Sequence, residues 1–255
     1  MNISMNNVQK INDNAYFTRI CEMLETIERE EAGAIARAAE ATYHSVKNGG
    51  LLHVFSTGHS HMIVEEMFYR SGGLIPVNPI LESDLMLHKG AITSTILERC
   101  PGKASEVLLK ANIEKGDTVI ISSNSGINTV PVEAALFVKK IGAVVVGITS
   151  VEISKKLESR HPDGKKLYQV SDIVIDNHTP MGDGLLEIPE TGQLTGGAST
   201  FGSLFIAQRI VLKVVNHYLG EGKFPPIFKS ANVPGGYEFN NNAIQEYCGR
   251  IKALC

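Results

Sequence analysis

The chain has 255 residues, of which 43% are hydrophobic, so it can fill the core of one large domain or of two small ones. Its 24 Lys and Arg residues are opposed by 27 Asp and Glu residues, which gives a formal net charge of -3 at pH 7. This balance lacks the excess of cations that a nucleic-acid backbone requires, and no basic stretch is rich in aromatic residues. Nucleic acid is therefore not expected as a partner.

The N-terminal residues and the cysteines indicate the compartment. Residues 1–14 are polar and lack the basic start and apolar run of a signal peptide, and no stretch approaches roughly 20 uninterrupted apolar residues. We therefore expect a cytoplasmic protein with no membrane partner. None of the cysteines has CxxC spacing, so they predict reduced thiols and neither a zinc site nor a redox motif. These cysteines are Cys21, Cys100, Cys248 and Cys255.

Apolar residues recur every three to four positions between residues 16 and 47, after a polar tail of residues 1–15. This spacing predicts one long amphipathic helix. Short apolar runs, too brief for helices, then alternate with helical patterns. Strands are expected at residues 51–56, 74–77, 117–122, 143–149 and 171–176. Helices are expected at residues 60–70, 89–112 with a break at Pro101-Gly102, 130–141, 152–158, 200–218 and 241–254.

Strands that alternate with helices at short spacing predict parallel pairing through right-handed crossovers, and hence a three-layer α/β/α fold. A ligand should then bind beyond the carboxyl ends of the strands. Residues 177–197 form a connection long enough to predict an ordered functional loop. No linker composition divides the chain, so residues 16–255 are predicted to form a single domain with a helical N-terminal extension.

The first loop of interest joins a predicted buried strand to a helix. It contains Thr57, Gly58, His59 and Ser60. A helix N-terminus offers unpaired N–H groups and partial positive charge, Gly58 permits close backbone approach, and Ser60 adds a hydroxyl. A plain turn in which Ser60 caps the helix is the structural alternative.

The second loop, residues 122–129, also lies between a buried strand and a helix. It concentrates hydroxyl, amide and glycine residues beyond what one helix cap needs, which suits the several acceptor oxygens of a phosphate. The residues concerned are Ser123, Asn124, Ser125, Gly126, Asn128 and Thr129. Neither a Gly-Lys-Ser/Thr loop nor a GxGxxG motif is present, which argues against nucleotide triphosphates and dinucleotides and favours a monophosphate.

These two loops resemble those of the sugar isomerase (SIS) domain family. The similarity extends from the first helix to Asp176, and the segments 55–61, 85–90 and 230–236 resemble a bacterial subgroup described as uncharacterised phosphosugar isomerases. The resemblance implies a flavodoxin-like, five-stranded parallel sheet, no cofactor, a homodimer or higher oligomer, and a small phosphorylated sugar as ligand. Matched residue by residue, it implies phosphate contacts from Ser60, Ser123, Ser125 and Asn128, with Asn124 nearby.

SIS domains occur in enzymes and in sugar-phosphate-sensing regulators, so the fold does not settle the function. An aldose-ketose isomerase acting through an enediol is the first hypothesis. A related epimerase, deaminase or etherase and a non-catalytic sensor are the alternatives. No helix-turn-helix with a linker is recognisable, which disfavours a DNA-binding regulator.

Isomerisation requires groups that move a proton between adjacent carbons. The catalytic candidates are His88, Glu82 and Glu66. Glu65 and Glu66 could equally form a solvated helix face, and the family's catalytic glutamate position matches Arg70 or Ser71 instead.

Three further sets of residues complete the interpretation. Glu98 is interpreted as a structural ion-pair partner. His178 and Asp183 could form a lid in the late loop. A metal bound by His59, His88, His178 and Asp183 has no spacing motif in its favour, so no metal site is predicted.

Overall fold

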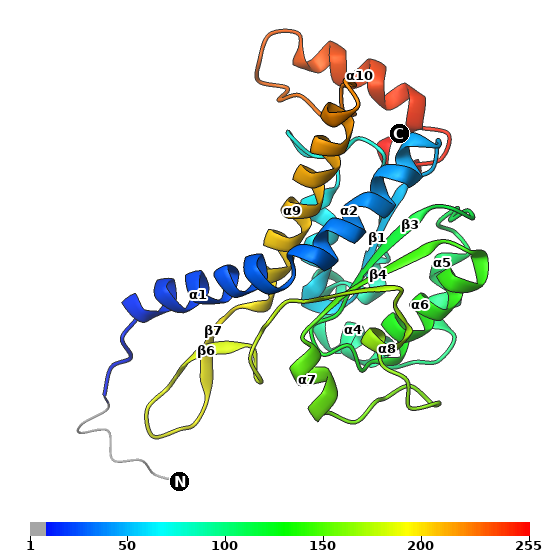
Figure 1. Ribbon diagram of the computed structural model, residues 1–255. Helices are drawn as coiled ribbons and strands as arrows, with labels where there is room; N and C mark the ends of the chain where they lie inside the picture. The colour runs from blue at the N-terminus through cyan, green and yellow to red at the C-terminus, as the bar shows by residue number, and fades with distance from the viewer. Residues whose placement is uncertain (1–8) are drawn as a thin grey trace.

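The computed structural model describes residues 9–255, so part of the predicted tail lies outside the described residues. Its centre is a five-stranded, all-parallel sheet in the order β2-β1-β3-β4-β5 (Figure 1). The strands are β1 Leu52–Ser56, β2 Val77–Ile80, β3 Thr118–Ser122, β4 Val144–Thr149 and β5 Ile173–Asp176. The predicted fold class is confirmed.

Helices cover both faces of this sheet because successive strand residues point to opposite sides. Val54, Ile120 and Val146 pack against one helical layer, and Val119 and Val145 against the other. The first layer contains α1 Asn14–Glu30, α2 Ala32–Lys47, α3 Met62–Met67 and α9 Ser199–Gly220, and the second contains α5 Lys103–Leu108, α6 Thr129–Ile141 and α8 Leu167–Val170. Two further short helices, α4 Ala91–Leu97 and α7 Val151–Lys156, lie near the carboxyl edge of the sheet (Figure 1).

One long N-terminal helix was predicted, but the segment consists of two helices that meet at Glu31. There the backbone leaves the helical conformation, with φ -99° and ψ 1°. The Glu31 carboxylate accepts hydrogen bonds from the Asp176 N–H at 3.2 Å and from His178 Nε2 at 3.2 Å. These long-range contacts fix the bend, and α1 projects away from the sheet (Figure 1).

The structure also differs from the prediction in one strand, one connection and the last helix. The strand predicted at 74–77 begins only at Val77, because Leu74 pairs with Ile227 and the Ile75 N–H bonds to Pro226 O. The late loop contains a missed antiparallel hairpin, β6 Gly184–Glu187 and β7 Leu194–Gly197. The last helix, α10, runs from Gly236 to Tyr247, ahead of the predicted 241–254.

A disulfide joins Cys248 to Cys255, which corrects the prediction of four reduced thiols. The bond closes a loop of the C-terminal segment around Ile251, which is fully buried. Cys21 and Cys100 are free. Across the described residues, no helix is both long enough and apolar enough to cross a membrane.

The disulfide should contribute measurably to stability. Closing a short loop restricts the unfolded chain by about 2–3 kcal/mol, so Cys248→Ser should lower Tm by roughly 5–10 °C. Thiol titration of the denatured, unreduced protein should count two reactive groups, rising to four after reduction. Cys21→Ser is the matched control, with an unchanged Tm; four reactive thiols before reduction would contradict the bond.

Candidate functional site

The two predicted phosphate loops lie side by side because the strands before them are in register. Ser56 and Ser122, the last residues of β1 and β3, are direct partners in the sheet. The Ser56 hydroxyl donates to Ser122 O at 2.6 Å, which joins the loop origins. Both loops therefore emerge together at the carboxyl edge of the sheet, where α/β proteins bind ligands.

The second loop is a close-packed turn that exposes backbone donors. Gly126 has φ +62°, and a Cβ there would approach Thr149 Oγ1 to 2.6 Å, so only glycine fits. Ser123 Oγ accepts from the Gly126 N–H at 3.3 Å. Among residues 9–255, no hydrogen-bond acceptor faces the N–H groups of Ser125, Ile127 and Asn128. Because they precede the 13-residue helix α6, these N–H groups are available as donors to an anionic ligand.

The remaining polar residues of this loop make contacts within the fold. Asn128 Oδ1 accepts from Arg160 Nη1 at 2.6 Å, and the Thr129 hydroxyl donates to Arg160 O at 2.9 Å. The Asn124 side chain accepts from Asn177 Nδ2 at 3.0 Å. Asn124 and Thr129 therefore hold the loop in place, while Arg160 brings a cation to it that the sequence analysis missed.

The first loop forms a 3-10 turn, Gly58–His61, before α3, in place of a regular helix start. Gly58 has φ +56°, and the buried His61 ring bonds to Gly58 O through Nδ1 at 2.5 Å. Ser60 faces a small crevice that it shares with hydroxyls at the N-terminus of α9, and His59 is exposed. Those hydroxyls belong to Ser199, Thr200 and Ser203, which had not been singled out.

Glu98 is the carboxylate that the structure brings to the loops. It caps the end of α4, its Oε2 accepts from the Thr57 hydroxyl at 2.8 Å, and its backbone carbonyl accepts from the Val130 N–H at 3.0 Å. Burial raises the pKa of Glu98, and the Thr57 hydroxyl, Arg99 and Arg160 only partly oppose that rise. Glu98 was predicted to be a structural ion-pair partner, but no salt bridge to it occurs within residues 9–255. It is instead a half-buried carboxylate with a raised pKa beside both loops.

The three predicted catalytic residues lie in different surroundings. Glu66 bonds to Gln208 at 2.7 Å and to Arg70, which holds it against α9. Glu82 lines a cavity at the β2 edge of the sheet. His88 is exposed and lies edge-on to His61 of the first loop, with ring centroids 6.3 Å apart.

The two residues predicted to form a lid are both engaged by the fold. His178 contacts Glu31, and that hydrogen bond raises the pKa of His178 despite partial burial. Asp183 caps α9, accepting from the Ser199 N–H at 2.8 Å and the Ser199 hydroxyl at 3.1 Å. No group of three or more His, Cys, Asp or Glu side chains is arranged for a metal within the described part of the chain.

Together these residues present hydroxyl and N–H donors on two adjoining turns, a nearby guanidinium and one carboxylate with a raised pKa. Such a set can bind a small phosphate group and exchange a proton with a molecule attached to it.

Comparisons with known proteins identify the family of this chain. The SIS domain profile matches residues 15–150. A UPF0309 protein of Halalkalibacterium halodurans is 39% identical over 240 residues, covering 94% of this chain and 96% of its own. One from Geobacillus kaustophilus is 41% identical over 246 residues, with 94% and 96% covered.

Among solved structures, a phosphoheptose isomerase from Francisella tularensis superposes with a TM-score of 0.53 at 15% identity, covering 79% of this chain and 95% of its own. At that identity the likeness concerns the fold alone. The family profile and the two UPF0309 relatives show that the chain belongs to the SIS domain family, in the subgroup of the UPF0309 proteins.

Proposed function

We propose that the protein binds a sugar monophosphate on its two loops and interconverts its aldose and ketose forms through an enediol. The observation that carries this proposal is the junction of the two loops at Ser56 and Ser122, with the Glu98 carboxyl bonded to Thr57 of the first loop. Membership of the SIS family supports the ligand class. Assembly as a homodimer or higher oligomer and a cytoplasmic location belong to the same proposal.

The phosphate would be held by Ser60, Ser123 and Ser125 and by the free N–H groups before α6. Hydroxyl and backbone donors satisfy a monophosphate dianion, and the positive end of the α6 dipole favours its charge. Arg160 approaches through its contact with Asn128 and adds a cation. Phosphate binding on these loops leaves the sugar carbons free to reach other groups at the carboxyl edge.

Glu98 is the group we assign to proton transfer. As a carboxylate it takes a proton from the carbon that bears the hydroxyl and returns one to the former carbonyl carbon; the hydroxyl proton moves between the two oxygens. Burial raises the pKa of Glu98, which makes its carboxylate a stronger base than a solvent-exposed glutamate. His88 is the second candidate, as a donor that assists opening of the sugar ring.

A non-catalytic phosphosugar sensor is the second candidate function. It is favoured by Arg70 or Ser71 at the position that matches the family's catalytic glutamate, and by the engagement of Glu66 with α9. A sensor and an isomerase share the binding step and differ only in turnover.

Thermal shift against sugar monophosphates and their unphosphorylated counterparts tests binding, because a ligand of the native state raises Tm by mass action. A shift confined to phosphorylated sugars is expected, and it selects the compounds to assay for turnover. No shift with any phosphosugar would overturn the binding proposal. If sugar phosphates bind but no bound aldose or ketose is converted, the non-catalytic sensor is the function that the result supports.

Replacing Ser123 and Ser125 by Ala should weaken phosphosugar binding about 100-fold, because each lost hydrogen bond to a charged phosphate removes about 1.5 kcal/mol. Titration calorimetry measures the change, and an unaltered Tm without ligand shows that the fold is kept. Ser105→Ala, on α5 outside the loops, is the matched control. Undiminished affinity in the folded double variant would contradict the proposed phosphate site.

A further inference from the structure

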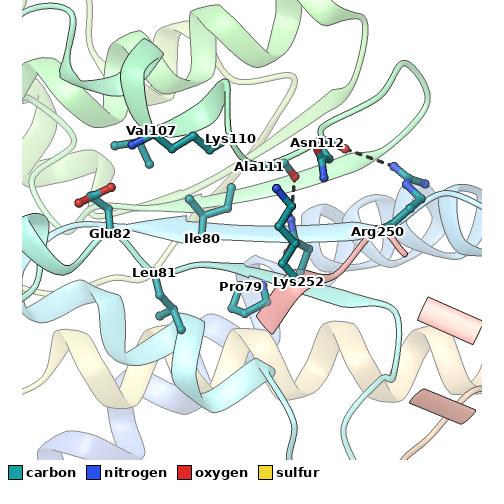
Figure 2. Close-up of a pocket in the computed structure, with 11 residues that line it drawn as sticks. Pro79, Ile80, Leu81, Glu82, Val107, Lys110, Ala111, Asn112, Arg250 and Lys252 are labelled. Carbon is teal, nitrogen blue, oxygen red and sulfur yellow. Dashed lines mark hydrogen bonds between the residues drawn. The ribbon is translucent and has the colours of Figure 1, made fainter. Parts of the chain in front are cut away.

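A second cavity lies along the outer edge of the sheet, beside β2 and away from the two loops (Figure 2). Its volume is about 170 Å³, and it shares no lining residue with residues 56–60 or 122–129. Its walls come from β2, from the end of α5 and the turn after it, and from the C-terminal segment that follows α10. Of the residues considered above for function, only Glu82 lines this cavity.

The inner wall of the edge cavity is apolar. Ile80, Val107 and Ala111 line it with only 4–9% of their surface exposed, and Pro79 continues the wall along β2. Closely packed side chains of this kind form a firm, dry surface that suits a compact apolar group.

The rim carries positive charge that the protein leaves largely uncompensated. In Figure 2 the Lys110 side chain enters from the α5 side and the Lys252 side chain from the C-terminal segment opposite. Lys252 forms no salt bridge within residues 9–255, and the acid nearest Lys110 is Glu106 at 4.0 Å. Glu82 is the one lining carboxylate, so the two lysines outweigh it along the rim even though Lys110 has a long ion pair with Glu106.

The wall that presents Lys252 is fixed in place. The adjoining Ile251 is fully buried, and Arg250 bonds to Asp117 at 2.8 Å and to the carbonyls of Gly49 and Asn112 at 3.2 and 3.4 Å. The Cys248–Cys255 disulfide closes the segment around these anchors. Because Asp117 and Glu114 neutralise Arg250, the charge available to a ligand belongs to the lysines.

We propose that the edge cavity is a second binding site, for a small organic anion whose apolar body lies on Ile80, Val107 and Ala111 while its negative group faces Lys110 and Lys252. An apolar wall with a few convergent charged groups is the usual construction of a small-molecule site. The ammonium groups select for negative charge, and the apolar wall selects against a bare inorganic anion. This site does not depend on the function proposed for the loops.

Phenyl phosphate is a suitable probe because it combines a small ring with a phosphate group. Its binding is measured by calorimetry in the Ser123→Ala, Ser125→Ala protein, so that the loops contribute little. We expect a Kd of about 1 mM or tighter, weakened about tenfold or more by the further changes Lys110→Met and Lys252→Met. Lys140→Met, at an exposed position on α6, is the matched control and should change nothing.

Two comparison probes decide whether both halves of the site are used. Inorganic phosphate lacks the ring and phenol lacks the charge, so both should bind at least about tenfold more weakly than phenyl phosphate. Equal binding of either compound would overturn the proposal, as would phenyl phosphate binding that survives the lysine changes or is absent at about 10 mM. Loss of loop binding in the serine variant has no bearing on these outcomes, which keeps the two sites distinguishable.

Discussion

Glu98→Gln should abolish isomerase turnover while leaving the protein as stable as the parent or more stable. The amide keeps an oxygen that accepts the Thr57 hydroxyl, now at 2.8 Å from Glu98 Oε2, but it cannot take up a proton. Loss of a general base typically costs about 100-fold or more in kcat. Binding of the phosphosugar should change little, because the proposed phosphate contacts come from the two loops.

The stability change of this variant depends on pH in a defined direction. Burial raises the pKa of Glu98 in the folded protein above its ordinary 4.5, so the folded state holds the proton more tightly than the unfolded chain. That contribution to stability is complete below the unfolded pKa and is lost as pH rises through the higher folded value. The Tm of Glu98→Gln relative to wild type should therefore rise as pH increases from the unfolded pKa of about 4.5 through the higher folded pKa.

Parallel assays of kcat and Tm test both halves of this expectation. Glu66→Gln and Glu82→Gln are the comparison variants, since each removes another carboxylate that the sequence predicts to be catalytic. If turnover persists in Glu98→Gln and disappears in one of these, the base lies there instead. His88→Ala should lower kcat only for substrates that must open a ring.

Local pattern alone was sufficient to predict the sheet. The runs at β1, β3 and β4 are apolar and β-branched and are bounded by glycine or polar residues, so they specify buried parallel strands without tertiary information. The loop after β3 was predicted because it holds more small polar residues than one helix cap needs. The structure shows in addition that the two loops are neighbours, because Ser56 and Ser122 pair in the sheet.

Residues whose position depends on distant partners could not be predicted in this way. Glu98 follows an ordinary amphipathic pattern, and only the packing of α4 beside Thr57 and α6 buries it. Similarly, the bend at Glu31 is produced by Asp176 and His178, about 145 residues away in sequence. Arg160 was missed because it lies in a loop without a motif, and its contact with Asn128 spans 32 residues.

A buried polar network stabilises the amino edge of the sheet, opposite the loops. Asp117 is 1% exposed and accepts from the Leu51 N–H, the Glu114 N–H, His53 Nε2 and Arg250 Nη2, at 2.8 to 2.9 Å. Burial would raise the pKa of Asp117, but the hydrogen bonds from His53, Glu114 and Leu51 outweigh it and lower the pKa. The carboxylate therefore stays ionised and joins β1, β3 and the C-terminal segment.

Asp117→Asn should cost about 3 kcal/mol, or roughly 10 °C in Tm, because it leaves the Arg250 charge opposed only by the exposed Glu114 and leaves at least one donor without a partner. Asp117 stabilises the fold above its unfolded pKa of about 3.8, and that contribution is lost as pH falls through the lower folded pKa. The difference in Tm between wild type and variant should thus be constant from about pH 5 to 7 and should shrink below about pH 4.

Arg250→Met distinguishes a broken charge pair from a general packing defect. Removing the guanidinium relieves the unpaired charge, so the double variant should be less destabilised than the sum of the two single variants, by about 1 kcal/mol or more. If the destabilisations of the two single variants simply add, the Asp117 carboxylate stabilises the fold only through its hydrogen bonds with His53 and with the N–H groups of Leu51 and Glu114. Because the network lies at the opposite edge of the sheet, phosphosugar affinity should be unchanged in every folded variant. A loss of affinity there would mean that the two edges are coupled through β1 and β3, the strands that begin in this network and end in the loops.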